Sequence, residues 1–185
     1  TNSYTPHPDR MLVAIAAMGA TDADLVGSGN GLTWTRQYHL VSVPTFRVAV
    51  FTAPTGGSPS AGAFTVTCTG DAASGALIAV YETDADQTTP IAHEIDEIID
   101  GVAGGGRTTY SLTLTQPTAA DAGVITWMWT GKSPPDATPP TGFTRDTNLG
   151  HGTPTEGFTS AHHVSPGSVS SLTWSGLQMG GWDLF

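Results

Sequence analysis

The sequence predicts an all-β protein, a two-sheet antiparallel β-sandwich. The chain has 185 residues, of which only 12% are charged, together with 23 glycines and 13 prolines. This composition is typical of many short strands joined by turns. Apolar and polar residues alternate over several segments of strand length, the period expected when one face of a sheet is buried. No βαβ alternation is visible, so each one-sided sheet is expected to bury its face on another sheet.

The clearest strand signal lies at residues 108–131. Apolar residues alternate with threonines and serines in its first half, and Ile125, Trp127 and Trp129 share one face in its second half. A connector with one proline and small polar residues separates the halves, so the two strands are predicted to pair antiparallel. Two tryptophans on one face supply a large apolar area, so the pair is expected mid-sheet with Ile125 and Trp127 buried.

Further strands are predicted along the whole chain. The run at residues 11–18 is apolar throughout, so it is expected to be buried on both faces. Phe64, Val66 and Cys68 alternate with threonines and are expected to point inward. Other strands are predicted at residues 32–43, 45–53, 76–83, 143–148, 158–164, 169–174 and 181–185.

The segments between these strands are predicted from glycine and proline content. Residues 1–9 carry two prolines and no periodicity, so they are predicted to be an N-terminal arm or linker, followed by one domain over residues 10–185. Residues 21–31 are predicted to be a loop, and the proline-rich residues 132–142 cannot enter a sheet interior. One short helix near residues 90–100 fits a Thr-Pro start and isoleucines at helical spacing, but β-branched isoleucines also suit a strand.

Charge and cysteine content exclude several classes of partner. The net charge is -10 and the six basic residues are scattered, so no nucleic acid is expected as a partner. No run approaches the roughly 18 apolar residues of a membrane span, so no membrane association is expected. Cys68 is the only cysteine, which rules out a disulfide framework within the chain and predicts a buried, inert thiol.

The sequence motifs associated with catalysis are incomplete. In the HEIDE segment the position four residues after His93 is Glu97, whereas a zinc metalloprotease needs a second histidine there. There is no G-x-S-x-G nucleophile motif, and GVAGGG is not followed by the lysine of a phosphate loop. We therefore expect no enzymatic activity, no catalytic residue and no cofactor.

Two clusters contain residue types that bind metals. An acidic cluster could supply oxygen ligands for calcium, although a plain acidic surface is favoured: Asp84, Asp86, Asp96 and Asp100. A histidine cluster could bind a metal or act in acid–base chemistry with Asp146 or Glu156: His151, His162 and His163. Adjacent histidines on a strand point to opposite faces, so polar residues at a surface or interface are favoured and no metal site is predicted.

The order of these segments resembles a known family. MLVAIAAMG at residues 11–19 is followed by GLTWT at 31–35, VAVFTA at 48–53, GFT at 142–144 and SLTWS at 171–175. This order is similar to the jelly-roll β-sandwich found in structural proteins of tailed bacteriophages and in bacterial surface proteins. The resemblance covers most of the chain and brings no catalytic signature. It implies a virion component: a capsid decoration protein, a head or tail fibre module, or a minor capsid or tail protein.

The resemblance also implies where the protein acts and what it contacts. We expect a homo-oligomer that is assembled in the host cytoplasm, becomes part of the extracellular particle and docks on major capsid or tail subunits. The arm is expected to order against a neighbour, and the prolines of residues 132–142 lower the entropy lost on docking. The candidate contact residues are Tyr4, Pro6, Pro8, Pro134, Pro135, Pro139 and Pro140.

The alternative function is a carbohydrate-binding or receptor-binding module on a virion or bacterial surface, with a host glycan as partner. Five tryptophans could form a sugar-stacking platform, but their alternation with polar residues favours a place in the core. Trp182, near the end of the sequence, is the candidate sugar contact. A hydrolase is the third and least favoured hypothesis.

Overall fold

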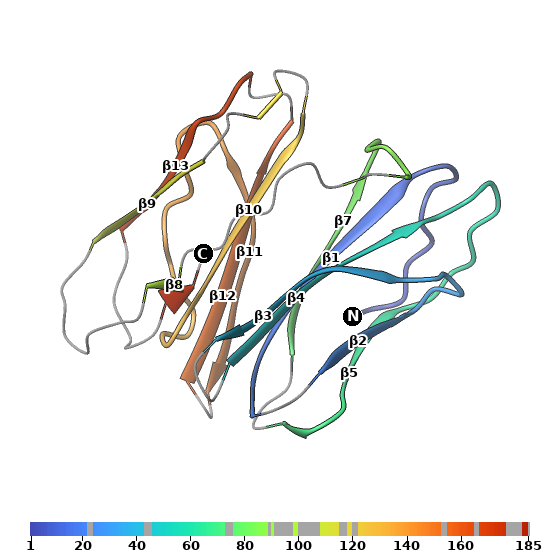
Figure 1. Ribbon diagram of the computed structural model, residues 1–185, viewed down its shortest axis with the longest axis horizontal. Coiled ribbons are helices and arrows are strands. Elements are labelled where there is room, and N and C mark those ends of the chain that lie inside the picture. The colour runs from blue at the N-terminus through green and yellow to red at the C-terminus, as the bar shows by residue number, and fades with distance from the viewer. Residues whose placement is uncertain are drawn as a thin grey trace. The chain divides into compact units, whose positions relative to one another are not determined.

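The computed structural model is all-β, as the sequence predicts (Figure 1). It describes residues 1–21, 24–42, 46–72, 76–88, 90, 98–99, 108–114, 118–119, 122–152, 155–164, 167–176 and 183–184. More than half of these residues lie in strands, every sheet is antiparallel, and none of the described residues is helical. The described part of the chain thus contains no helix that could cross a membrane. The chain divides into two compact units, Thr1–Glu94 and Ile95–Phe185.

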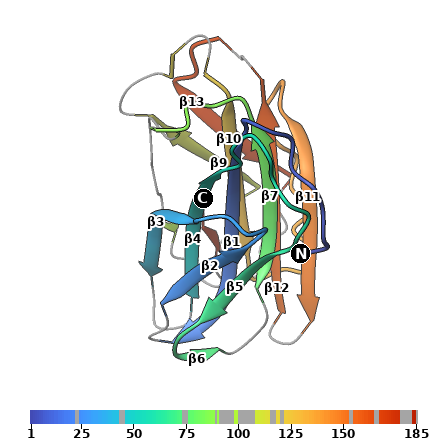
Figure 2. The ribbon, with the colours of Figure 1, turned by 90° about the vertical axis from the view of Figure 1, so that its right-hand side faces the viewer.

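Unit 1, Thr1–Glu94, consists of one five-stranded sheet and one two-stranded sheet. Its strands are β1 (Met11–Thr21), β2 (Leu25–Gly29), β3 (Thr35–Ser42), β4 (Phe46–Pro54), β5 (Phe64–Cys68), β6 (Asp71–Ala72) and β7 (Leu77–Thr83). Strand β1 is central, with β4 and β7 on its two sides, β3 beyond β4, and β6 paired with its last two residues. Strands β2 and β5 form the separate pair, which crosses in front of β1, β4 and β7 in Figure 2.

The core of unit 1 lies between these two sheets. Side chains from β1 and β4 contact Leu25 of β2 and Phe64 of β5, both of which are buried. Residues 11–18 are buried at every position, so the prediction of a strand buried on both faces is confirmed. In β5, Phe64 is buried while Val66 and Cys68 are half-buried. The inward face of β5 is therefore the predicted one, but Cys68 is not the fully buried thiol that was expected.

Unit 2, Ile95–Phe185, also contains a five-stranded and a two-stranded antiparallel sheet. Its strands are β8 (Ile98–Ile99), β9 (Thr109–Thr113), β10 (Val124–Thr130), β11 (Thr144–Gly152), β12 (Thr155–His163), β13 (Ser171–Ser175) and β14 (Asp183–Leu184). The larger sheet has the order β11-β12-β10-β14-β8, so β10 occupies the predicted central position. The smaller sheet pairs β13 with β9.

Two predictions about residues 108–131 are wrong. Strands β9 and β10 do not pair with each other, because β9 pairs with β13 and β10 pairs with β12 and β14. Ile125 and Trp127 are half-buried, whereas Met128 on the opposite face of β10 is fully buried. The β9–β13 pair covers the Met128 face and adds Tyr110 and Trp174 to its core. The other face is buried only near the end of β10, at Trp129, so packing of the second layer decides which face is buried along the whole strand.

Two connecting segments also differ from expectation. Residues 21–31 were predicted to be a loop, but they contain strand β2, which pairs with β5. Burial of the Leu25 side chain in the core of unit 1 stabilises this strand. Most of the expected helix near residues 90–100 lies outside the described residues, and Ile98–Ile99 form strand β8 within it. The single domain over residues 10–185 and the jelly-roll topology stay predictions.

Candidate functional site

The N-terminal arm, residues 1–9, lies against unit 1. Tyr4 and Gly62 form an antiparallel bridge in which each backbone N–H donates to the other residue's carbonyl, at 2.8 and 3.0 Å. The side-chain amide of Asn30 donates to the carbonyls of Gly62 at 2.9 Å and Tyr4 at 3.3 Å. Asn30 is 4% exposed. The arm is therefore bonded to unit 1 through the buried Asn30 in the turn that follows β2.

A second attachment lies where the arm joins β1. The Thr55 hydroxyl donates to the carbonyl of His7 at 2.9 Å and accepts from the backbone N–H of Arg10 at 2.8 Å. The N–H of Asp9 donates to the carbonyl of Gly56 at 2.8 Å. Asp9 has φ of 54°, the left-handed conformation that an aspartate in a turn tolerates. The arm thus reverses direction at Asp9 before β1 begins.

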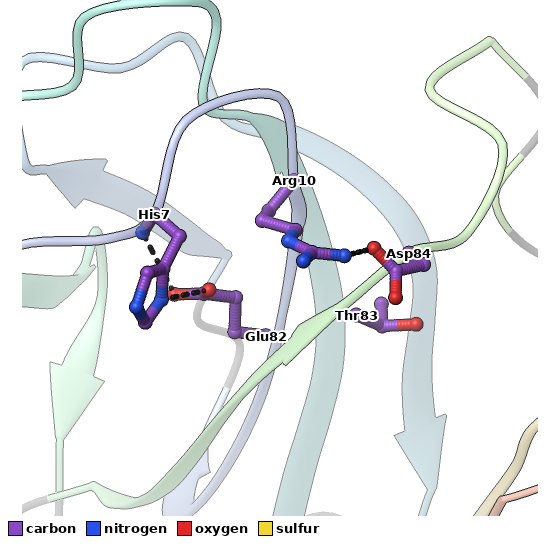
Figure 3. A pocket seen from close by; sticks show the side chains of 5 residues that line it. All are labelled: His7, Arg10, Glu82, Thr83 and Asp84. Carbon is purple, nitrogen blue, oxygen red and sulfur yellow. Dashed lines mark hydrogen bonds and ion pairs between the residues drawn. The ribbon is translucent and has the colours of Figure 1, made fainter.

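Side chains from the junction of the arm with β1 and from the end of β7 form a small pocket at this turn (Figure 3). Both the backbone N–H and the ring Nδ1 of His7 approach the Glu82 carboxylate, at 3.1 and 2.6 Å. Arg10 pairs with Asp84 beside them, and Thr83 completes the lining. The two carboxylates each face a nitrogen-bearing side chain, so the pocket presents paired polar groups to solvent. Such an arrangement suits polar docking.

The pKa of Tyr4 is affected by the same Glu82 carboxylate. Burial and, secondarily, the nearby Glu82 carboxylate raise the pKa of Tyr4 to about 12, because both disfavour the phenolate. The phenol oxygen itself is buried without a hydrogen-bond partner. Tyr4 and His7 of the arm are therefore both influenced by Glu82.

The proline-rich segment, residues 132–142, is held on unit 2 in a comparable way. Thr138 and Ser175 of β13 form a bridge with hydrogen bonds of 2.7 and 3.0 Å, and Ala137 is buried in the core of unit 2. The start of the segment lies over Gly150 and Gly157, which are register partners on β11 and β12. A Cβ at Gly157 would lie 2.0 Å from the Lys132 carbonyl oxygen. These glycines leave the space that the segment fills.

The candidate contact residues differ in accessibility. Pro8 and Pro134 are exposed, Tyr4 and Pro139 are half-buried, and Pro6, Pro135 and Pro140 are buried. The exposed prolines are thus the ones that a partner can reach. Trp182, the candidate sugar contact, lies outside the described residues.

In each of the two clusters considered for metal binding, the described side chains contact other residues rather than one another. His162 pairs with Asp146 at 2.7 Å, whereas the ring of His163 packs edge-on against Phe143. Asp84 pairs with Arg10, and Asp86 accepts hydrogen bonds from Thr88. Asp96 and Asp100 lie outside the described residues. Within the described ranges no three His, Cys, Asp or Glu side chains are grouped to hold a metal ion.

Sequence reasoning missed the residues that anchor the arm. Glu82 is 75 positions from His7, and Thr55 is 48 positions from it. No local pattern connects positions so far apart. Asn30 had a usable signal, since the Asn30-Gly31 dipeptide marks a tight turn.

Comparisons of the chain with protein-family models, with curated proteins and with solved structures find no match. The resemblance to structural proteins of tailed bacteriophages therefore stays a prediction.

Proposed function

We propose that this protein is a non-enzymatic structural component of a tailed-bacteriophage particle, of the capsid decoration or minor capsid or tail type. In this proposal it is a homo-oligomer with a jelly-roll-like sandwich. It docks on neighbouring capsid or tail subunits after assembly in the host cytoplasm.

The main support is the pair of proline-containing segments that are held in place on their own units. The arm exposes Pro8 and residues 132–142 expose Pro134. Hydrogen bonds from Thr55 to His7 in the arm, and between Ser175 and Thr138 in the second segment, hold the two backbones. A segment that is ordered before binding loses less conformational entropy when it docks. Two such segments give an otherwise regular β-protein defined points of attachment.

The surface chemistry supports the same function. Strands β9 and β13 present threonines and serines outward, and the hydroxyls of Ser111 and Thr173 bond across the pair at 2.8 Å. Only 12% of the residues are charged. A surface of short, uncharged side chains has little rotamer entropy and little charge to desolvate when subunits pack together.

The test is quantitative mass spectrometry of particles purified on a density gradient from a culture that produces the protein. We expect a constant copy number per particle, consistent with a symmetric arrangement. Recovery of the chain only outside the particle fractions would refute the proposal. Deletion of residues 1–9 should lower occupancy, whereas Thr67→Ala, an exposed substitution on β5 that alters neither proline segment, should leave it unchanged.

A carbohydrate-binding or receptor-binding module is the second candidate, and the position of Trp127 favours it. Trp127 is half-buried and stacks on Phe158 with ring centroids 6.4 Å apart. A tryptophan with an accessible face can stack on the C–H surface of a sugar. Retention of the protein on host cell-wall polysaccharide, lost in Trp127→Ala, would favour this function, and equal retention of both proteins would exclude Trp127 as the contact.

A further inference from the structure

The N-terminal arm lies along one edge of the β2–β5 sheet, where Tyr4 forms an isolated bridge with Gly62 just before β5 begins. The backbone groups of Gly62 bond to Tyr4, and the side-chain hydroxyl of Thr1 bonds to the N–H and carbonyl of Phe64, at 3.0 and 3.2 Å. Residues 62 and 64 thus face the arm, as expected from the two-residue period of a strand, and β2 pairs with the other edge of β5. Without the arm, this edge would present unpaired backbone groups that can template another strand.

The hold on the arm is mainly polar. Pro6 is the only buried residue among residues 1–9, and Tyr4 is half-buried. The contact between the arm and unit 1 also leaves polar atoms unsatisfied, because the Tyr4 hydroxyl and the Asn30 Oδ1 atom are buried without hydrogen-bond partners. Segments with few buried apolar contacts and exposed polar contacts open at lower free-energy cost than a packed core. The arm is therefore ordered in the folded molecule, as the docking proposal requires, yet it opens more readily than the core strands of unit 1.

The arm also has a hinge. Pro8 and Asp9 form a turn, and Asp9 adopts a left-handed conformation. Immediately after it, the carbonyl of Arg10 accepts from the N–H of Thr55 at 2.9 Å, which continues the β1–β4 ladder. Rotation at residues 8–9 therefore moves residues 1–7 and leaves β1 in place.

We propose that the arm exchanges between two copies of this chain, so that each copy's arm occupies the β5 edge of the other. The partner is thus a second copy, which deepens the proposed structural function and rests on it. An opened molecule leaves the backbone of Gly62 and the side chain of Asn30 in need of partners. The same segment of a second copy supplies them in the same register and places its His7 on Glu82. Exchange preserves every contact outside the hinge, and close packing on a particle raises the effective concentration that favours it.

Chemical cross-linking in the full chain tests the exchange. The test protein carries Cys68→Ser, Thr5→Cys and Ala61→Cys, two exposed positions that flank the Tyr4–Gly62 bridge. A short bifunctional maleimide joins the two new thiols. A closed arm gives a cross-link within one chain, whereas an exchanged arm gives a covalent dimer. The matched control carries Cys68→Ser, Ser111→Cys and Thr173→Cys, a cross-strand pair on β9 and β13 that has no part in the exchange.

We expect a dimer fraction that clearly exceeds that of the control. It should rise about tenfold for each tenfold increase in protein concentration while dimers are rare, as mass action requires. Cross-links only within single chains at every concentration would overturn the exchange, as would the absence of any cross-link between positions 5 and 61. Copy number on particles is measured separately. If no cross-linked dimer forms but the copy number per particle is normal, only the exchange is refuted. If the dimer forms but the protein is absent from particles, only the particle function is refuted.

Discussion

A buried hydrogen bond in unit 2 allows a quantitative test of the core. The indole N–H of Trp174 donates to the hydroxyl of Thr126 at 3.1 Å, and the two residues are 1% and 8% exposed. Thr126→Val keeps the side-chain volume but removes the acceptor, which leaves a buried N–H unpaired. An unpaired buried donor costs about 1–3 kcal/mol, so we expect Thr126→Val to lower the free energy of unfolding by that amount.

The same bond predicts how two substitutions combine. Trp174→Phe removes the indole N–H together with part of the ring, so no donor remains for Thr126 to satisfy. In that background Thr126→Val should cost less, with a coupling free energy of about 1 kcal/mol between the two positions. Trp174→Ala should be the most severe change, at roughly 3–5 kcal/mol, because it leaves a cavity in the core.

Urea unfolding followed by far-UV circular dichroism measures these differences. With a slope of roughly 1–3 kcal/mol per molar urea, a loss of about 2 kcal/mol moves the midpoint by about 1 M. The matched control is Thr113→Val, an exposed threonine on β9, for which a change within about 0.5 kcal/mol is expected. If Thr126→Val costs no more than Thr113→Val, the Trp174–Thr126 bond does not stabilise the core.

Three further predictions concern unit 1. Glu82→Gln should speed hydrogen exchange at the amides of Tyr4 and Asp9, because a neutral amide is a weaker hydrogen-bond partner than a carboxylate for the two His7 nitrogens. Amides of the β1–β4 ladder should be unaffected, and equal rates in both proteins would contradict the anchoring role of Glu82. The pKa of Tyr4 in the folded protein, about 12, lies above its ordinary value of 10.0. Its contribution to stability is therefore full below pH 10 and is lost as the pH rises through 12, and Tyr4→Phe should abolish this part of the pH dependence in unfolding experiments. Gly29→Ala should destabilise unit 1 by more than about 2 kcal/mol, because φ is 123° and the new Cβ would lie 1.9 Å from the carbonyl oxygen of Ala63; Gly31→Ala, with no atom within 4 Å, should cost about 1–2 kcal/mol, and equal thermal midpoints for the two variants would show that the close approach is relieved.

The candidate site could be predicted only in part. Proline content alone indicated the arm and residues 132–142 as segments outside the sheets. It did not indicate that Pro6 and Pro135 are buried while Pro8 and Pro134 are exposed. Burial depends on what the segment lies against, and the surfaces beneath these segments, around Gly62 and Gly157, are distant in sequence.

The sequence by itself determined the fold class and most strand positions. The alternation through Phe64 and Val66 and the unbroken apolar run of β1 are local properties, because the two-residue period follows from the geometry of one extended chain. Strand positions can therefore be predicted without knowledge of the rest of the molecule.

Only the tertiary structure decided how the strands are used. Strand β10 pairs with β12 and β14 rather than with its near neighbour β9, and its dry face carries Met128 rather than Ile125. The arm, in turn, is attached to Glu82, far along the chain. Backbone hydrogen bonds are nearly the same for every pair of strands, so local sequence does not select the partner. The choice is made by the layer that best covers the combined apolar face, here the β9–β13 pair with Trp174, and that layer exists only once the whole unit has folded.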